Sequence, residues 1–256
     1  MRVRTVVRTL SEICLTLGTL IVLFVVYVLY WTGVRADAAM DREIDRLQDR
    51  WSTGAVTGTD TDTGADTDAG PDAGPDAGGG SGEDPAPPGA DPGPGARARH
   101  GRGESFAIMY IPRFGRDWAK PVLEGTATGT LKKGLGHYTG TAPLGAPGNF
   151  AVAGHRRTYG DPFKDFPRLR PGDAVVLTDG TAWYTYRIDA KPYRTVPSDT
   201  GVIEPVPDRS GYRRPGRYLT LTTCDPEWGH SHRLIVWAHL ERTSPAALGK
   251  PDTLPG

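Results

Sequence analysis

Residues Ser52 to Gly103 constrain the fold of this chain most strongly, because they offer almost no apolar side chains. The stretch consists mainly of glycine, alanine, aspartate, threonine and proline and includes the repeat AGPDAGPDAGG. Such a composition buries too little apolar surface to offset the entropy lost on ordering, so we predict that it stays disordered. As a flexible coil of about 50 residues it spans roughly 40 Å. It divides the chain into a short N-terminal part and one later domain.

The formal net charge of zero hides a strong segregation of charge. From Trp51 to Ala96 there are nine acidic residues and no lysine or arginine. Elsewhere the basic residues are dispersed and form no stripe with aromatic residues, which argues against nucleic-acid binding. We interpret the acidic stretch as a spacer without a binding role.

Residues 13–34 carry no charge. A helix needs about 20 apolar residues to cross a hydrocarbon core of about 30 Å, and aromatic residues gather near the end of this run, as at a membrane interface (Tyr27, Tyr30 and Trp31). A cleaved signal peptide is the alternative, because the sequence ADA at 36–38 resembles a cleavage site. The apolar region of a signal peptide typically covers only about 7 to 15 residues, so an uncleaved transmembrane helix is the favoured interpretation.

Arginines flank this run on both sides, so the positive-inside rule does not decide its orientation. The residues before it are too few to fold, and we therefore expect the large C-terminal part to be exported. The predicted localisation is the plasma membrane, with a single pass and the folded domain on the extracellular side.

Short strands separated by glycine and proline turns follow the low-complexity stretch. An Asp179-Gly180 turn between two β-rich runs predicts a hairpin from Asp173 to Asp189. We expect little helix, at most short turns near 131–134 and 163–169. Many short strands of this kind predict an all-β barrel or sandwich. The other predicted strands are Ser105–Pro112, Gly148–His155, Tyr218–Cys224, Arg233–Leu240 and short runs around Val122 and Val196.

The expected organisation has five parts. They are a cytoplasmic N-terminus (1–12), a transmembrane signal-anchor (13–34), a juxtamembrane segment and disordered linker (35–104), a folded β-domain (105–241) and a flexible tail (242–256). Within the juxtamembrane segment, residues Asp41 to Trp51 can form a short helix, since three apolar side chains share one face.

Cys224 is the most informative single residue. It lies at a predicted strand end beside a polar loop, and it cannot pair within the molecule because the other cysteine, Cys14, lies in the predicted anchor. A buried, inert cysteine is the competing interpretation. A cysteine nucleophile acts as its thiolate and needs a base or a cation nearby.

Among the histidines, His155 is the stronger candidate for that base, because it ends an apolar strand and begins a loop; His137 stays open. His230 and His232 could bind a metal with His239, but no acid or thiol at ligand spacing completes a site, so we predict no metal and no cofactor. If the last two strands are neighbours, alternation along them brings Arg233 close to the cysteine. A guanidinium there could hold a substrate backbone and stabilise an oxyanion.

The motif TLTTC ends at Cys224, Arg233 follows nine residues later, and His155 precedes in AVAGHR. This combination resembles the sortase family. The stretches IPRFGRDW, GLGHYTGTAPLGAPGNFAVAGHRRTYGDPF and RPGDAVV are similar to its actinobacterial class E branch. The resemblance covers about Ser105 to Leu240.

That resemblance implies an eight-stranded β-barrel and a cysteine transpeptidase without a cofactor. Cys224 would attack the Thr–Gly bond of an LAxTG- or LPxTG-type sorting signal, His155 would protonate the leaving amine, and Arg233 would steady substrate and oxyanion. Tyr138 matches a tyrosine linked to the LAxTG preference, and Thr223 matches a substrate-contacting threonine.

The implied partners are secreted proteins with a C-terminal sorting signal, a peptidoglycan precursor as amine acceptor, and the plasma membrane. Two alternatives remain on the residues alone: a membrane-tethered cysteine hydrolase and a non-catalytic cell-surface binding domain.

Overall fold

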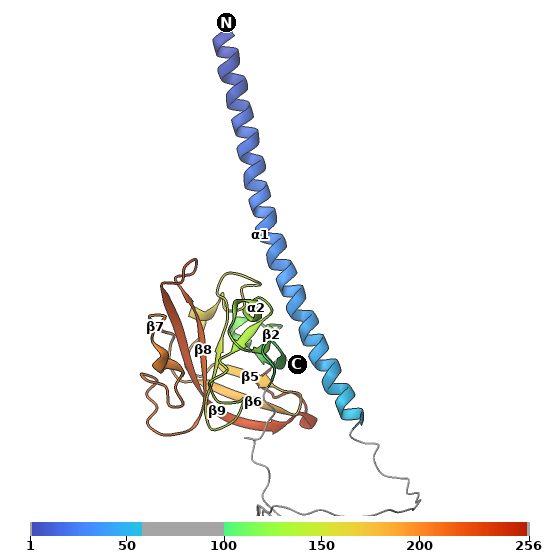
Figure 1. Ribbon diagram of the computed structural model, residues 1–256, viewed down its shortest axis with the longest axis vertical. Helices are drawn as coiled ribbons and strands as arrows, with labels where there is room; N and C mark the ends of the chain where they lie inside the picture. The colour runs from blue at the N-terminus through green and yellow to red at the C-terminus, as the bar shows by residue number, and fades with distance from the viewer. Residues whose placement is uncertain (1, 58–99, 255–256) are drawn as a thin grey trace, which may run out of the picture.

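The computed structural model describes residues 2–57 and 100–254, which form one long helix and one β-domain (Figure 1). Most of the stretch predicted to be a disordered linker, residues 58–99, lies outside the described residues. The helix α1 runs without interruption over Arg2–Thr57. It therefore extends through the predicted juxtamembrane segment and six residues into the stretch expected to be linker.

Nine strands make up the β-domain, and eight of them close into a barrel. The sheet order is β6-β5-β1-β2-β3-β4-β8-β9-β7, and an additional pairing between β6 and β9 closes the ring. The short strand β7 pairs with β9 outside the ring. The predicted eight-stranded barrel is confirmed. The strands are β1 (Ser105–Tyr110), β2 (Ala119–Glu124), β3 (Leu135–His137), β4 (Gly148–Ala153), β5 (Ala174–Thr178), β6 (Ala182–Ile188), β7 (Tyr193–Thr195), β8 (Arg217–Asp225) and β9 (His232–Pro245).

Alternation along the strands separates two apolar clusters. The barrel interior holds side chains such as Leu219 and Leu221 from β8, which are fully buried. A smaller cluster of Val202, Ile235 and Trp237 lies elsewhere, where partly buried aromatic residues cover the other face of β9. The face of β8 and β9 opposite the interior is thus partly covered as well.

The β5–β6 hairpin illustrates how local sequence builds the barrel. Gly180 adopts a φ of 83°, which favours glycine, and Asp179 Oδ1 accepts hydrogen bonds from the backbone amides of Thr181 (2.9 Å) and Ala182 (3.0 Å). The predicted Asp-Gly turn is present.

Helical segments in the β-domain are short: α2 (Thr128–Leu131), η1 (Pro112–Phe114), η2 (Phe166–Arg168), η3 (Thr200–Ile203) and η4 (Ala246–Leu248). Strand β9 continues to Pro245 because its last residues pair with β6, so it passes the predicted domain boundary at residue 241.

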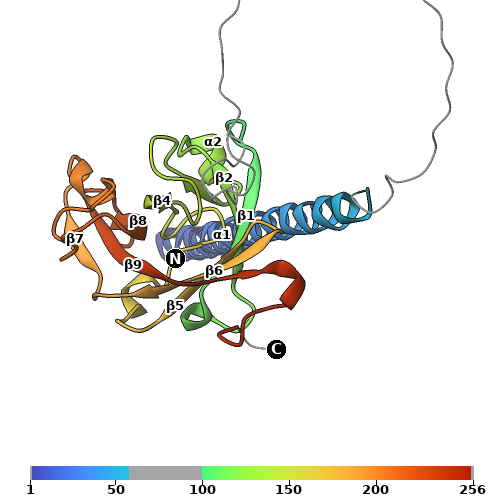
Figure 2. The same cartoon turned by 90° about the horizontal axis from the view of Figure 1, so that it is seen from below.

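Within the described residues, one helix is long and apolar enough to cross a membrane, with its apolar window at Val7–Val25. The C-terminal half of α1 packs on β1 and β2 instead (Figure 2). Met40 and Leu47, two turns apart on one helix face, are buried there.

Candidate active site

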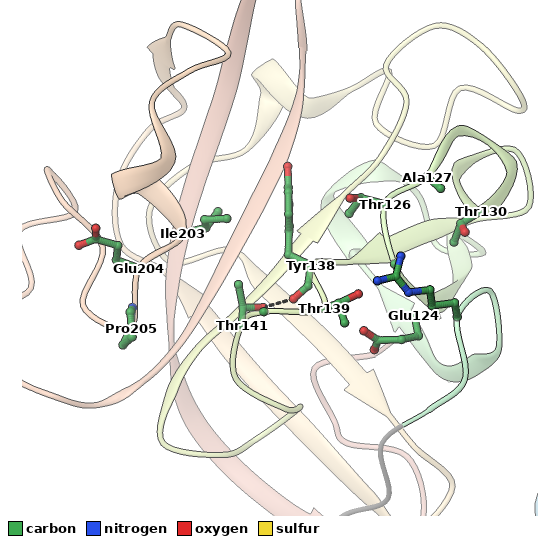
Figure 3. A pocket seen from close by; sticks show the side chains of 13 residues that line it. Glu124, Thr126, Ala127, Thr130, Tyr138, Thr139, Thr141, Ile203, Glu204 and Pro205 are labelled. Atoms are coloured by element: carbon green, nitrogen blue, oxygen red, sulfur yellow. Dashed lines mark hydrogen bonds between the residues drawn. The ribbon is translucent and has the colours of Figure 1, made fainter.

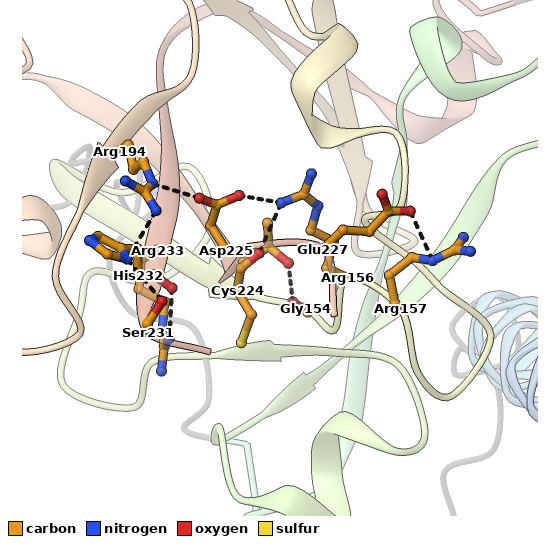
Figure 4. A network of polar contacts seen from close by, with 11 residues as sticks. Gly154, Arg156, Arg157, Arg194, Cys224, Asp225, Glu227, Ser231, His232 and Arg233 are labelled. Carbon is orange, nitrogen blue, oxygen red and sulfur yellow. Dashed lines mark hydrogen bonds and ion pairs between the residues drawn. The ribbon is translucent and has the colours of Figure 1, made fainter. Parts of the chain in front are cut away.

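The hairpin of β8 and β9 places Cys224 directly opposite Arg233. The two strands are antiparallel, and their register pairs these two residues as well as Thr222 with Ile235. Figure 4 shows the two side chains extending to the same side of the hairpin. Because paired residues alternate along both strands, the nucleophile candidate and the cation candidate share one sheet face, as the sequence pattern indicated.

His155 reaches this place through a parallel pairing of distant strands. Ala153 at the end of β4 pairs with Thr222 in β8. Beyond this pair, the Gly154 amide donates to the Thr222 carbonyl (3.1 Å), and the Thr223 hydroxyl donates to the Gly154 carbonyl (2.8 Å). A side chain at Gly154 would collide with Phe163 and Leu135, so glycine lets the chain pass closely just before His155.

A small cavity of about 190 Å³ connects the two reactive candidates. Its lining includes Cys224 and His155, together with residues from the β8–β9 loop such as Trp228 and His230. The Arg233 guanidinium uses Nη1 to donate to the carbonyls of His230 (3.0 Å) and His232 (2.9 Å). These bonds hold the guanidinium against its own loop.

The surroundings of His155 favour the neutral imidazole. Burial is the main cause that lowers the pKa of His155, and the positive charge of Lys132 adds to it. Among the described residues no hydrogen-bond partner contacts its buried Nε2. The Tyr159 ring lies beside the imidazole, with the two ring centres 5.1 Å apart. A neutral imidazole with an uncommitted nitrogen can take a proton from a thiol or pass one to a leaving group.

Asp225, the residue after the cysteine, joins the two loops of the site (Figure 4). Its carboxylate accepts from Arg156 Nη1 (2.5 Å) and from Arg194 Nε (2.6 Å). Burial raises the pKa of Asp225, but the hydrogen bonds and charges of the two arginines outweigh burial and lower it. Arg157 makes a second link, with its Nε 3.1 Å from Glu227 Oε1.

Sequence reasoning missed this network. Arg156 directly follows His155, and Asp225 directly follows Cys224. The available signal was therefore this pair of oppositely charged residues, one beside each reactive candidate. Only the parallel pairing of β4 and β8 shows that the two charges meet.

Tyr138 lies on the same face of β8 as the cysteine. Its hydroxyl is 3.0 Å from the Thr222 hydroxyl, two residues before Cys224. It also lines a pocket of about 480 Å³ (Figure 3), where it stands between a wall that includes Thr126 and a wall that includes Ile203. Tyr138 therefore connects an open pocket to the strand that carries the thiol.

Thr223 faces the opposite side of β8. It is 2 % exposed, and its hydroxyl is bonded to Gly154. In this structure Thr223 fixes the backbone just before His155, and its predicted contact with a substrate stays a prediction.

His230 lines the cavity beside the thiol, whereas His137 and His239 are engaged elsewhere. His137 is buried with its Nδ1 2.8 Å from Glu124 Oε2, and His239 Nδ1 lies 2.8 Å from Asp189 Oδ1. Across residues 2–57 and 100–254, no group of three or more histidine, cysteine or acidic side chains is arranged to hold a metal ion.

A closed β-barrel with a thiol, an imidazole and a guanidinium at one end of adjacent strands defines a class of cysteine enzymes. The sequence model of the Sortase domain matches residues 109–241, and the chain belongs to the sortase family, whose members are cysteine transpeptidases. The predicted family is therefore confirmed.

Individual relatives agree with this assignment. The chain is 34% identical to sortase SrtE1 of Streptomyces coelicolor, over 96% of this chain and 60% of that protein, so it spans less than two thirds of that relative. The structure of sortase E from Streptomyces avermitilis is 68% identical, with a TM-score of 0.58 over 61% of this chain and all of that one. Sortase E1 from S. coelicolor, crystallised with a tripeptide in the active site, is 38% identical, with a TM-score of 0.57 over 61% and 99%.

Proposed function

We propose that this chain cleaves an LAxTG- or LPxTG-type sorting signal between threonine and glycine and transfers the threonine carbonyl to an amine of a peptidoglycan precursor. The observation that carries the proposal is the register of β8 and β9, which sets Cys224 opposite Arg233, with His155 lining the same cavity as the thiol. The domain acts on the extracellular side, tethered by α1.

In each half of the reaction, His155 takes up one proton and then gives it away. The Cys224 thiol gives its proton to His155, and the thiolate attacks the threonine carbonyl carbon. Arg233 stabilises the negative charge on the carbonyl oxygen. His155 then donates the proton to the departing glycine amine, which leaves a thioester on Cys224. An incoming amine attacks this thioester and loses a proton to His155. The new amide forms as the Cys224 thiolate departs, and His155 returns that proton to the sulfur.

A lowered His155 pKa favours the transfer of the proton from the imidazolium to the leaving amine. An imidazolium whose pKa is lowered is a stronger acid, so it transfers its proton more readily to the leaving amine. The thiol and the imidazole interact, so a pH–rate profile reports values of the pair.

The pocket beside Tyr138 supports a substrate role for that residue, because Tyr138 joins the pocket to Thr222, two residues before the thiol. We predict that Tyr138→Phe changes the ratio of kcat/KM for LAxTG and LPxTG peptides. An unchanged ratio removes Tyr138 as a determinant of the signal preference. Tyr193→Phe, in the strand outside the barrel, is a suitable control.

The test of the function is incubation of the chain with each peptide and an amine, followed by mass spectrometry. We expect a thioester adduct on Cys224 and an amide product, both lost in Cys224→Ala. Formation of the free acid alone, whatever amine is added, identifies a hydrolase instead. Absence of any adduct, even with an electrophilic analogue of the signal, contradicts the proposal and favours a binding domain.

A further inference from the structure

The helix α1 joins the predicted membrane span to the β-domain without a break, and its C-terminal half is attached to the barrel. Met40 is 0 % and Leu47 1 % exposed. Polar contacts flank them: Lys120 Nζ is 2.8 Å from Asp37 Oδ1, and Arg50 Nη2 donates to the Ser105 carbonyl (3.0 Å). The buried apolar strip of Met40 and Leu47, with polar contacts on either side, therefore fixes the β-domain to the C-terminal half of α1.

Two close contacts give the direction of the barrel along α1. A side chain at Gly160, in the loop after His155, would come within 2.7 Å of Asp37 Oδ1. A side chain at Gly180, in the β5–β6 turn, would come within 2.4 Å of Trp51. These two helix residues are 14 positions apart, or about 21 Å along the axis. The His155 loop therefore lies beside the part of α1 that is closer to the apolar segment, and the β5–β6 turn lies beside the part that is farther from it.

Figure 1 agrees with this direction, because the β8–β9 loop points toward the same end of the molecule as the N-terminal half of α1. Strand pairing agrees as well: Gly180 lies beside the pairing of Ala182 with Pro245, at the far end of β9 from Arg233. The catalytic end of the barrel faces the membrane span, and the β5–β6 turn faces away from it.

The distance to the bilayer follows from the helix rise. The uncharged run ends at Val34 and the apolar window at Val25, which are 3 and 12 residues before Asp37. At about 1.5 Å per residue, the His155 loop lies about 5–18 Å along the helix from the hydrocarbon boundary. The headgroup layer is about 5–8 Å thick on each side. The catalytic end thus lies in or just beyond this layer.

The surface at this end has the chemistry of a membrane interface. Trp228 in the β8–β9 loop is 72% exposed, and the Arg157 guanidinium carbon lies 4.5 Å from the centre of its ring. Tyr159 is 39% exposed, and Lys132 Nζ lies 5.1 Å from its ring centre. Exposed aromatic rings favour the headgroup region, and the Lys132 ammonium beside Tyr159 attracts anionic lipids. Arg157 is paired with Asp161 (3.3 Å) and Glu227 (3.1 Å), so it adds no net positive charge.

We propose that the docked helix holds the catalytic end of the barrel against the bilayer, with Trp228 and Tyr159 in the headgroup layer. The partner is the lipid surface itself. The contact does not depend on the reaction, but its benefit rests on the proposed function: Cys224 then meets substrates that are present at the membrane surface without a search through solution.

The test uses the full chain in vesicles of phosphatidylcholine and phosphatidylglycerol that contain a headgroup spin-labelled lipid. The native cysteines are replaced (Cys14→Ser, Cys224→Ala), and a fluorophore is attached to Trp228→Cys or, as the matched control, to Leu248→Cys. Leu248 is 78% exposed and follows β9 at the opposite end of the barrel. We expect several-fold stronger quenching at 228 than at 248. Equal quenching at the two positions, or none at 228, overturns the proposal.

A second variant tests the docking. Met40→Gln with Leu47→Gln removes the buried strip, and we expect quenching at 228 to fall to the level at 248, whereas Arg42→Gln on the exposed helix surface leaves it unchanged. Quenching that persists in the double variant shows that α1 does not orient the domain. Since Cys224 is absent from every chain compared, failure here is distinct from failure of the peptide assay.

Discussion

A partly buried imidazole such as that of His155 holds its proton less readily than one in water, and His155 also has a lysine nearby. Lys132 does not bond to the imidazole; it lies over the ring of Tyr159, which in turn lies against His155. At the scale of single residues, the acidity of this candidate catalytic imidazole thus depends on a residue that does not line the cavity.

We predict that Lys132→Gln raises the pKa of His155, because one of the two causes that lower it is removed. The rise is partial, since burial, the larger cause, remains. An NMR titration of the His155 ring protons measures the effect, with the midpoint moving to higher pH. Lys133→Gln changes an adjacent exposed lysine and serves as the control. A midpoint that stays the same in Lys132→Gln contradicts the electrostatic account.

Arg233 is predicted to tolerate no exchange for lysine. Its Nη1 is engaged by two loop carbonyls, so an oxyanion must be met by the remaining N–H groups of the planar fork. Lysine offers no such fork, and loss of one oxyanion donor costs about 100- to 1,000-fold in kcat. We expect a loss of this size in Arg233→Lys under saturating peptide, with Arg242→Lys on the same strand as the control. Retained turnover shows that the planar fork of Arg233 is not required.

Two loops meet at the active site, and at the scale of elements their coupling depends on charge. The loop after β4 carries His155, and the loop after β8 begins two residues after the cysteine, since β8 ends at Asp225. The Arg156–Asp225 pair joins them at 2.5 Å, with both side chains largely buried. We interpret Arg156 as a positioning residue that holds the His155 imidazole and the Cys224 thiol at a fixed distance and orientation.

Arg156→Gln is expected to lower kcat about 10- to 100-fold with little change in KM, since small misplacements of reacting groups have effects of this size. Arg156→Lys should restore part of the rate by keeping the charge. Arg116→Gln, at an exposed site, is the matched control. A loss in Arg156→Gln that appears only as a lower melting temperature, with the kcat of the folded fraction intact, assigns the pair to stability alone.

The predictable elements are those with local signals. The β5–β6 hairpin follows from Asp179-Gly180, and the facing of Cys224 and Arg233 follows from alternation along β8 and β9. Strand β3 was missed because three residues carry no periodic pattern and its pairing with β2 is parallel and long-range. The meeting of His155 with the thiol came from family resemblance, since β4 and β8 pair across about seventy residues. The apolar face within residues 41–51 was a local signal for a packed helix, but it did not identify the partners β1 and β2, which lie beyond the linker.

The whole molecule combines a helix of about 84 Å with a barrel fixed to its second half. We predict that this docking protects α1 from proteolysis. Burial of a methionine side chain contributes about 1.5–3 kcal/mol, so its loss should expose the helix substantially. Met40→Gln should therefore speed trypsin cleavage after Arg46 about tenfold in detergent. Arg42→Gln, which leaves the buried strip intact, should not; equal rates in both variants and the parent chain indicate an undocked helix.

The strand that closes the barrel also carries a residue of the candidate active site. The strand that seals the ring against β6 is β9, and Arg233 is its second residue. A chain that has not yet placed this strand has neither a closed barrel nor Arg233 opposite its thiol. The candidate site is therefore incomplete until β9, which also closes the barrel, is in place.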